Sequence, residues 1–209
     1  MNAAAALALD EVSCVRANRT LFSQLSLTLQ PDQLLRVHGA NGAGKTSLLR
    51  MICGLLNPSA GQVLWRGQRL GALREEFGRE LLYLGHAAAL KDELSPLDNL
   101  QAASTLAGHD ACQADLMQAL GGAGLAGFEH VPARRLSQGQ RRRSVLARLA
   151  LAGPACLWVL DEPFNALDSA AVGWLDGLVR GHLRLGGMVV LTSHQDLPLD
   201  GLPHRELAL

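Results

Sequence analysis

The residues of this chain that are best suited to chemistry form one glycine-rich loop. In order along the chain they are Gly39, Ala40, Asn41, Gly42, Ala43, Gly44, Lys45, Thr46 and Ser47. The three glycines carry no side chain, so the backbone can curl around an anion with successive N–H groups pointing inward. Lys45 supplies a positive charge for the β- and γ-phosphates of a nucleotide, and Thr46 supplies a hydroxyl for Mg²⁺. The loop therefore predicts a nucleotide site with Mg²⁺.

A pair of acidic residues, Asp161 and Glu162, follows the apolar run Leu157–Leu160. The run predicts a buried central strand, and open α/β sheets present their ligands at the C-terminal ends of the strands. There Asp161 would hold Mg²⁺ through water, and Glu162 would polarise the water that attacks a phosphate. Phosphoryl transfer depends mainly on positioning and charge neutralisation. We therefore expect Glu162 to be a catalytic residue.

A helix is expected to begin at Ser137, which is followed by Gln138, Gly139 and Gln140. The Ser137 hydroxyl can cap the helix, and Gly139 lets a phosphate approach the exposed N–H groups. This segment predicts a second point of contact with a nucleotide.

Positive and negative charge are balanced, with 19 basic and 19 acidic residues and a formal net charge of zero. The balance gives no electrostatic reason to expect a nucleic acid, so we expect no nucleic-acid partner. Three arginines at 141–143 follow the expected helix start. We interpret them as a partly solvated helix face, with a small basic patch for nucleic acid as the alternative.

The elements that must position these residues alternate between strands and helices. Strands are expected at 7–12, 25–29, 34–38, 62–65, 81–84, 156–161 and 188–192 and near the C-terminus, and helices at 46–55 and 170–185. Residues 86–150 are rich in alanine, leucine and glutamine without a clear strand, which indicates a helical subdomain. The pattern predicts one α/β domain over 1–209, in which 1–85 and 151–209 form a parallel core with an antiparallel β edge.

Two further observations limit the class of protein. The cysteines at 14, 53, 112 and 156 form no C-x-x-C motif, so we expect four buried thiols and no zinc site. The longest apolar run, 149–160, is too short to cross a bilayer, and residues 1–9 lack the basic flank of a signal peptide. We expect no membrane span in the chain.

Taken in order, the glycine loop, the segment Leu136–Gln140 and the run Leu157–Glu162 resemble three motifs of the ABC transporter ATPase family. These are the phosphate loop, the signature motif and the Walker B strand. The resemblance implies the P-loop NTPase fold of ABC type, with ATP and Mg²⁺ as cofactors and ATP hydrolysis as the activity. It also implies that Ser47 contacts the α-phosphate. A head-to-tail homodimer would sandwich each ATP between the loop of one copy and the signature of the other.

Three single residues acquire a role only through this resemblance. His194 matches the histidine that senses the γ-phosphate. His86 stands where the family has a glutamine that touches Mg²⁺ and hinges the helical subdomain; a neutral imidazole could reach a metal-bound water, and a surface histidine is the alternative. Arg16 falls at the position of the aromatic residue that stacks on adenine, and its guanidinium could stack there instead.

The segments Tyr83–His86, Leu94–Leu100 and Ser193–Leu197 resemble, with Arg16, the ATP-binding subunits of cytochrome c maturation (haem exporter) systems. The resemblance implies a peripheral ATPase on the cytoplasmic side of the bacterial inner membrane, paired with integral membrane subunits of the CcmB and CcmC types. Its hydrolysis would serve haem export or handling and the release of a haem-loaded chaperone. The alternatives are the ATPase subunit of another small ABC transporter and an iron–sulfur assembly ABC ATPase.

The predicted site residues fall into three groups. The catalytic residues are Glu162 and His194; the metal ligands are Thr46, Asp161 and His86; the nucleotide-binding residues are Gly39, Ala40, Asn41, Gly42, Ala43, Gly44, Lys45, Thr46, Ser47, Arg16, Ser137, Gly139 and Gln140.

Overall fold

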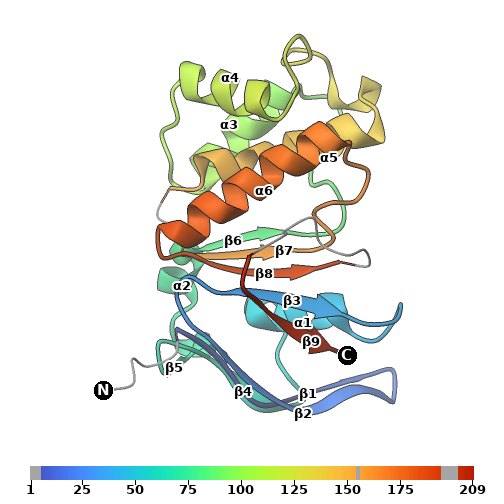
Figure 1. Cartoon of the computed structure of the whole chain (residues 1–209), viewed down its shortest axis with the longest axis vertical. Helices are drawn as coiled ribbons and strands as arrows, with labels where there is room; N and C mark the ends of the chain where they lie inside the picture. Colours follow the sequence, from blue (N-terminus) through green and yellow to red (C-terminus); the bar gives the residue numbers. More distant parts are fainter. Residues whose placement is uncertain (1–5, 154–155, 194–201) are drawn as a thin grey trace. The chain divides into compact units, whose positions relative to one another are not determined.

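The computed structural model describes residues 6–153, 156–193 and 202–209 (Figure 1). The chain divides into two compact units. The first comprises the described residues of Met1–Tyr83, Ala155–Glu162 and His182–Leu209. The second comprises those of Leu84–Pro154 and Pro163–Gly181.

A five-stranded sheet in the order β6-β7-β8-β3-β9 is built largely from the first unit. Its strands are β3 (Leu34–His38), β6 (Leu81–Leu84), β7 (Leu157–Leu160), β8 (Met188–Thr192) and β9 (His204–Ala208). Strand β8 pairs in parallel with both β3 and β7, and β3 pairs in parallel with β9. Every residue of β7 and β8 is buried, as expected for the centre of a parallel sheet.

The first unit also contains a four-stranded sheet in the order β2-β1-β4-β5. Its strands are β1 (Leu7–Arg16), β2 (Arg19–Leu29), β4 (Ala60–Trp65) and β5 (Gln68–Arg69), and all of their pairings are antiparallel. Ala17 and Asn18 join β1 to β2 with φ values of 46° and 60°. A tight two-residue hairpin turn requires two consecutive residues with left-handed backbone angles.

Helix α1 (Lys45–Ile52) supplies much of the core of the first unit. It lies between the two sheets in Figure 1 and buries Leu48, Leu49 and Ile52 against residues of both. The other helical segments of this unit are η1 (Leu70–Ala72) and α2 (Arg74–Glu80), and Phe77 of α2 joins the same core. Burial of this apolar surface is the main force that holds the unit together.

The second unit is helical. Its segments are α3 (Pro96–Leu106), α4 (Gln113–Gly122), η2 (Ala133–Arg135), α5 (Gln138–Leu146), η3 (Ala147–Leu151) and most of α6 (Ser169–Arg184). A separate core contains Leu100, Leu116, Leu120, Leu125 and Ala147. No helix among the described residues is both long enough and apolar enough to cross a membrane.

The structure confirms the α/β class, with a parallel-strand sheet, an antiparallel sheet and helices. Several local expectations were wrong. The first helix ends at Ile52 instead of position 55 because Gly54 adopts a left-handed φ of 68°. The first strand continues to Arg16 instead of ending at position 12, and helix α2 was not predicted. Cys112 is exposed and Cys156 is partly exposed, so the four thiols are not all buried.

Candidate nucleotide site

The glycine loop connects β3 to α1 within the first unit. Gly39, Gly42 and Gly44 all have positive φ values, of 145°, 80° and 109°. A Cβ on Gly44 would lie 3.1 Å from the ring of Phe22, so both the backbone angle and the space favour glycine there. These angles let the loop turn sharply from the strand into the helix. Such a loop directs backbone N–H groups and the start of the helix toward one anion-sized space.

Lys45 brings a positive charge into this loop. The side chain is largely buried, and its ammonium donates hydrogen bonds to the carbonyl oxygens of Gly39 at 2.8 Å and Ala40 at 3.1 Å. Because Lys45 is the first residue of α1, its charge adds to the positive end of the helix dipole. The loop therefore combines the features that bind a phosphate chain.

Each carboxylate oxygen of Asp161 accepts a hydrogen bond from a hydroxyl group. The Thr46 hydroxyl donates to Oδ2 at 2.9 Å, and the Thr192 hydroxyl donates to Oδ1 at 2.8 Å. Asp161 is almost fully buried, and Thr192 is completely buried at the end of β8. The first of these contacts brings together two of the predicted metal ligands, which are 115 positions apart in the sequence.

Glu162 follows Asp161 with a left-handed backbone, at a φ of 52°. Its backbone N–H donates a hydrogen bond of 2.8 Å to the Thr192 hydroxyl. Glu162 as a whole is only 6% exposed, so its carboxylate is screened from bulk water. A buried carboxylate next to a phosphate site can act on a water molecule there.

The charge of Asp161 influences neighbouring groups in the first unit. Burial raises the pKa of the Cys53 thiol and of the Tyr83 phenol, and the Asp161 carboxylate raises both further. Both groups therefore stay neutral at ordinary pH. The negative field at the end of β7 favours a cation.

The oxygen atoms of Thr46 and Asp161 fit the requirements of Mg²⁺. Mg²⁺ takes hard oxygen ligands and in nucleotide sites uses few protein groups, with phosphates and waters completing its shell. A hydroxyl and a carboxylate oxygen 2.9 Å apart can reach the same ion. Within the described ranges there is no cluster of three or more histidine, cysteine or acidic residues that could bind a metal on its own.

Helix α5 in the second unit begins as predicted. The Ser137 hydroxyl accepts a hydrogen bond from the Gln140 N–H at 3.2 Å, and the Gln140 side chain accepts one from the Ser137 N–H at 2.9 Å. This reciprocal pair is a capping box, which fixes the first turn. A Cβ on Gly139 would lie only 2.9 Å from the carbonyl oxygen of Ala166, so glycine is also needed for close packing.

The three arginines after this helix start fit the predicted partly solvated face only in part, since Arg141 and Arg143 are partly exposed. Arg142 is buried and donates to the carbonyl oxygen of Gly85 at 3.1 Å. Arg141 donates to Asp92 at 2.6 Å and Arg143 to the carbonyl oxygen of Gly124 at 3.1 Å. The three side chains connect segments of the second unit, and the burial of Arg142 departs from the predicted partly solvated face. Their partners lie too far away in sequence for a local charge pattern to identify them.

The other residues predicted for the site are Arg16, His86 and His194. Arg16 is exposed at the end of β1, paired across the hairpin with Arg19. His86 is exposed just beyond β6 and belongs to the second unit. His194 lies outside the described residues. Thr192 is the site residue that the sequence did not single out; the available signal was a polar residue at the end of an apolar strand, directly before the predicted His194 motif.

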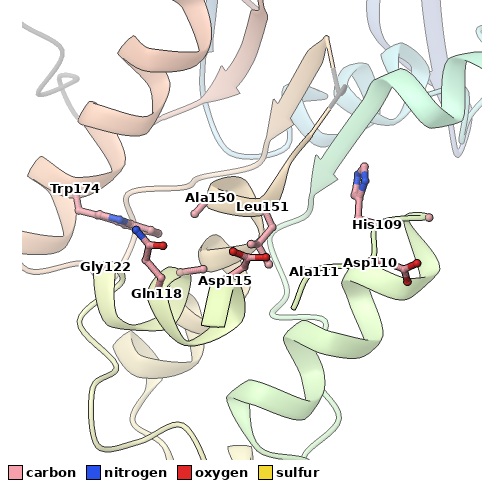
Figure 2. Close-up of a pocket in the computed structure, with 11 residues that line it drawn as sticks. His109, Asp110, Ala111, Asp115, Gln118, Gly122, Ala150, Leu151 and Trp174 are labelled. Atoms are coloured by element: carbon pink, nitrogen blue, oxygen red, sulfur yellow. The ribbon is translucent and has the colours of Figure 1, made fainter. Parts of the chain in front are cut away.

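A cavity of about 690 Å³ lies within the second unit. It is lined by Gly108, His109, Asp110, Ala111, Asp115, Gln118, Ala119, Gly122, Ala150, Leu151 and Trp174, and Figure 2 shows Trp174 of α6 beside Gln118 and Gly122 of α4. The Asp115 carboxylate already accepts a hydrogen bond from the Cys112 N–H at 3.1 Å. Among the residues that the structure describes, none of the predicted site residues lines this cavity.

Comparison of sequences places the chain close to a group of bacterial proteins. The family model described as "ABC transporter" matches residues 22–165. The cytochrome c biogenesis ATP-binding export protein CcmA of Dechloromonas aromatica is 49% identical over 96% of this chain and 98% of that protein. The protein of the same name from Methylococcus capsulatus is 50% identical over 94% of this chain and 95% of that protein.

Comparison of structures gives the same fold. A putative ABC transporter ATP-binding protein from Pyrococcus furiosus matches with a TM-score of 0.82 at 24% identity, covering 97% of this chain and 96% of that one. The ATP-binding subunit of an ABC transporter matches with a TM-score of 0.78 at 23% identity, covering 90% and 79%. At these identities the likeness concerns the fold alone.

Proposed function

Because this chain belongs to the ABC transporter family of ATP-binding proteins, we propose that it is the ATP-hydrolysing subunit of a membrane complex for cytochrome c maturation. The contact between Thr46 and Asp161 carries the catalytic part of this proposal, since it joins the phosphate loop to the acidic strand end. The identity of about half of all residues to cytochrome c biogenesis ATP-binding proteins, over nearly the whole chain, supports the cellular role.

The loop from Gly39 to Ser47 binds the phosphates of ATP. The inward-facing N–H groups and the Lys45 ammonium neutralise the β- and γ-phosphates, and the Ser47 hydroxyl reaches the α-phosphate. Arg16 stacks on the adenine. Thr46 and Asp161 would hold Mg²⁺, which when bound supplies positive charge to the phosphate oxygens.

Hydrolysis is a transfer of the γ-phosphoryl group to water. The Glu162 carboxylate orients the water and accepts its proton as the oxygen bonds to phosphorus and the bond to ADP breaks. His194 senses the γ-phosphate, as its match to the histidine of the family implies. The products are ADP and inorganic phosphate.

Two copies of the chain complete the site. Ser137, Gly139 and Gln140 of one copy lie at a capped helix N-terminus, whose backbone N–H groups and helix dipole attract the γ-phosphate bound by the other copy. ATP therefore stabilises a head-to-tail homodimer, and hydrolysis loosens it. The whole chain acts as a single ABC ATPase domain with a helical subdomain.

Integral membrane subunits of the CcmB and CcmC types bind the helical subdomain beside His86 and the segment 91–99. His86 acts as the hinge between the nucleotide site and the membrane partner, and its neutral imidazole would reach a water on Mg²⁺ when the ion is bound. The complex works at the cytoplasmic side of the inner membrane in haem export or handling, and its hydrolysis releases a haem-loaded chaperone.

The proposal is tested by purifying tagged Glu162→Gln protein from detergent-solubilised membranes with ATP and Mg²⁺. Mass spectrometry identifies the partners, and the Soret absorbance reports haem. We expect cytochrome c maturation subunits together with haem. Recovery of a different permease without haem would retain the ATPase role and overturn the maturation role. A protein absent from membranes and bound to iron–sulfur assembly factors would favour that alternative.

A further inference from the structure

The hydroxyl of Thr192 bonds to both acidic residues of the nucleotide site. It donates to Asp161 Oδ1 at 2.8 Å and accepts from the Glu162 N–H at 2.8 Å. Residues 161 and 162 belong to the turn after β7, whereas Thr192 ends the neighbouring strand β8. One hydroxyl therefore joins the ends of two adjacent strands.

The surroundings of Thr192 otherwise favour an apolar residue. The four residues before it in β8 are Met188, Val189, Val190 and Leu191, and all are buried. Thr192 is 0% exposed, so its hydroxyl has no access to bulk water. A buried hydroxyl is tolerated when it is hydrogen-bonded, and here both its donor and its acceptor capacity are used.

The two hydrogen bonds fix features that hydrolysis needs. Asp161 is held from opposite carboxylate oxygens, by Thr192 at Oδ1 and by Thr46 at Oδ2. A metal ion that takes the Thr46 oxygen would disturb the second contact, whereas the Thr192 contact involves the other oxygen. The hydrogen bond from Thr192 to Oδ1 therefore keeps the plane of the Asp161 carboxylate fixed, while Oδ2 and the Thr46 hydroxyl are available to a metal ion.

The bond to the Glu162 N–H acts on a strained backbone. Glu162 has a φ of 52°, in the left-handed region that residues other than glycine seldom adopt. Strained backbones at functional sites persist where surrounding contacts hold them. The direction in which the Glu162 side chain leaves the main chain depends on this angle.

We propose that Thr192 is a positioning residue for ATP hydrolysis, which sets the orientation of the Asp161 carboxylate and the backbone of Glu162. The inference rests on the proposed ATPase function of this site. Thr192 bonds to Asp161 and Glu162, and it acts through these two neighbours. Its loss should therefore affect turnover and Mg²⁺ use more than the binding of ATP.

The test compares Thr192→Val with Thr192→Ser in the purified full-length chain. Valine keeps the shape and removes the hydroxyl, whereas serine keeps the hydroxyl and removes a methyl group. For Thr192→Val we expect kcat to fall by about 10- to 100-fold, as for a small misplacement of reacting groups. The Mg²⁺ concentration for half-maximal rate should rise, while KM for ATP stays within about twofold, since ATP contacts are unchanged. Thr192→Ser should restore most of the rate.

Thr105→Val is the matched control, because the exposed hydroxyl of Thr105 donates to the carbonyl oxygen of Gln101 within α3. It should leave all three kinetic values unchanged. Thermal unfolding of each variant separates a folding defect from a kinetic one, since a misfolded fraction lowers the rate without shifting the Mg²⁺ requirement.

Two results would overturn the assignment of Thr192. One is a Thr192→Val protein with the kcat and Mg²⁺ requirement of the parent; the other is a Thr192→Ser protein as slow as Thr192→Val, which would indicate a packing role for the methyl group. If the parent protein itself hydrolyses no ATP, the ATPase proposal fails first, and that outcome is visible before any variant is measured.

Discussion

Some residues of the nucleotide site supply charge, and others fix the orientation of the charged side chains. Lys45 and Asp161 carry the charges, whereas Thr46 and Thr192 bond to the carboxylate oxygens of Asp161. Glu162 lies beside them on a backbone whose φ of 52° costs on the order of 1–3 kcal/mol. This strain is characteristic of a functional position, and it places a buried carboxylate directly after the proposed metal ligand.

Replacing Glu162 by glutamine should separate binding from turnover. Glutamine keeps the size and polarity of the side chain but cannot accept the proton of the attacking water. We expect ATP affinity and ATP-dependent dimerisation to be retained and the steady-state hydrolysis rate to fall by at least about 100-fold. Phosphate release and size-exclusion chromatography measure the two properties. Hydrolysis near the parent rate would contradict the role of Glu162, and Glu75→Gln on the exposed face of α2 is the control.

At the scale of elements, the ends of helices and strands place the functional groups. The start of α1 carries Lys45 and Thr46, the end of β7 precedes Asp161, and the start of α5 carries the capping box of Ser137. Each position follows from a backbone rule: helix N-termini expose N–H groups, and parallel strands present their C-terminal ends at one edge. The functional groups therefore lie at the ends of helices and strands, and core packing holds these elements in place.

Two substitutions of Ser137 should distinguish helix capping from phosphate contact. Ser137→Ala removes the cap and should lower the free energy of unfolding by about 1 kcal/mol. Ser137→Asp keeps an N-cap acceptor, so stability should be retained, but its negative charge repels a phosphate at the helix start. We expect Ser137→Asp to lose ATP-dependent dimerisation in the Glu162→Gln background. A stable dimer of that double variant would remove Ser137 from the dimer interface.

The last turn of α6 contains a histidine that should make stability depend on pH. His182 stacks on Trp158 with ring centroids 3.9 Å apart and an interplanar angle of 7°. Burial lowers the pKa of His182, with hydrogen bonds to backbone groups opposing this effect in part. The unfolded chain therefore binds the proton more readily than the folded protein.

The sign of the effect follows from this difference. Between the ordinary pKa of 6.5 and the lower folded value, the unfolded state holds more protons, so the free energy of unfolding decreases as pH falls. His182→Phe keeps a flat ring against Trp158 and removes the titration. Its stability should change less than that of the parent between about pH 7 and about pH 5 in urea titrations. His130→Phe, at an exposed position, should retain the parent dependence; identical curves for His182→Phe and the parent would contradict the prediction.

At the scale of the whole molecule, the proposed function requires more than one chain. The glycine loop belongs to the first unit and the capped helix start of α5 to the second, and the proposed site uses the loop of one copy with the helix start of another. In the proposed function the nucleotide controls assembly, and the membrane partner responds to that assembly.

His86→Ala tests how the nucleotide site communicates with the membrane subunits. His86 is exposed, so its loss should leave the stability and ATP affinity of the isolated chain nearly unchanged. We expect the stimulation of ATPase activity by the reconstituted membrane subunits to fall severalfold. His130→Ala is the control at another exposed histidine of the same unit. An equal loss of nucleotide affinity in His86→Ala would identify His86 as a direct ligand instead of a hinge.

Local sequence patterns determined much of this protein. Short apolar runs predicted the strands that became β3, β6 and β8, and glycine spacing predicted the turn between β3 and α1. The capping residues of α5 were also predictable, since a capping box spans only a few positions. In each case the residues that interact are close together in the chain or follow a fixed period.

Only the tertiary structure decided the role of Thr192 and the burial of Arg142. Thr192 meets Asp161 because β7 and β8 pair in parallel, with Leu160 opposite Leu191, which brings together residues 31 positions apart. Arg142 finds its acceptor at Gly85, 57 positions earlier. A hydroxyl or guanidinium carries no local mark of such a partner, because the free energy of burying it depends on which distant acceptor the fold supplies.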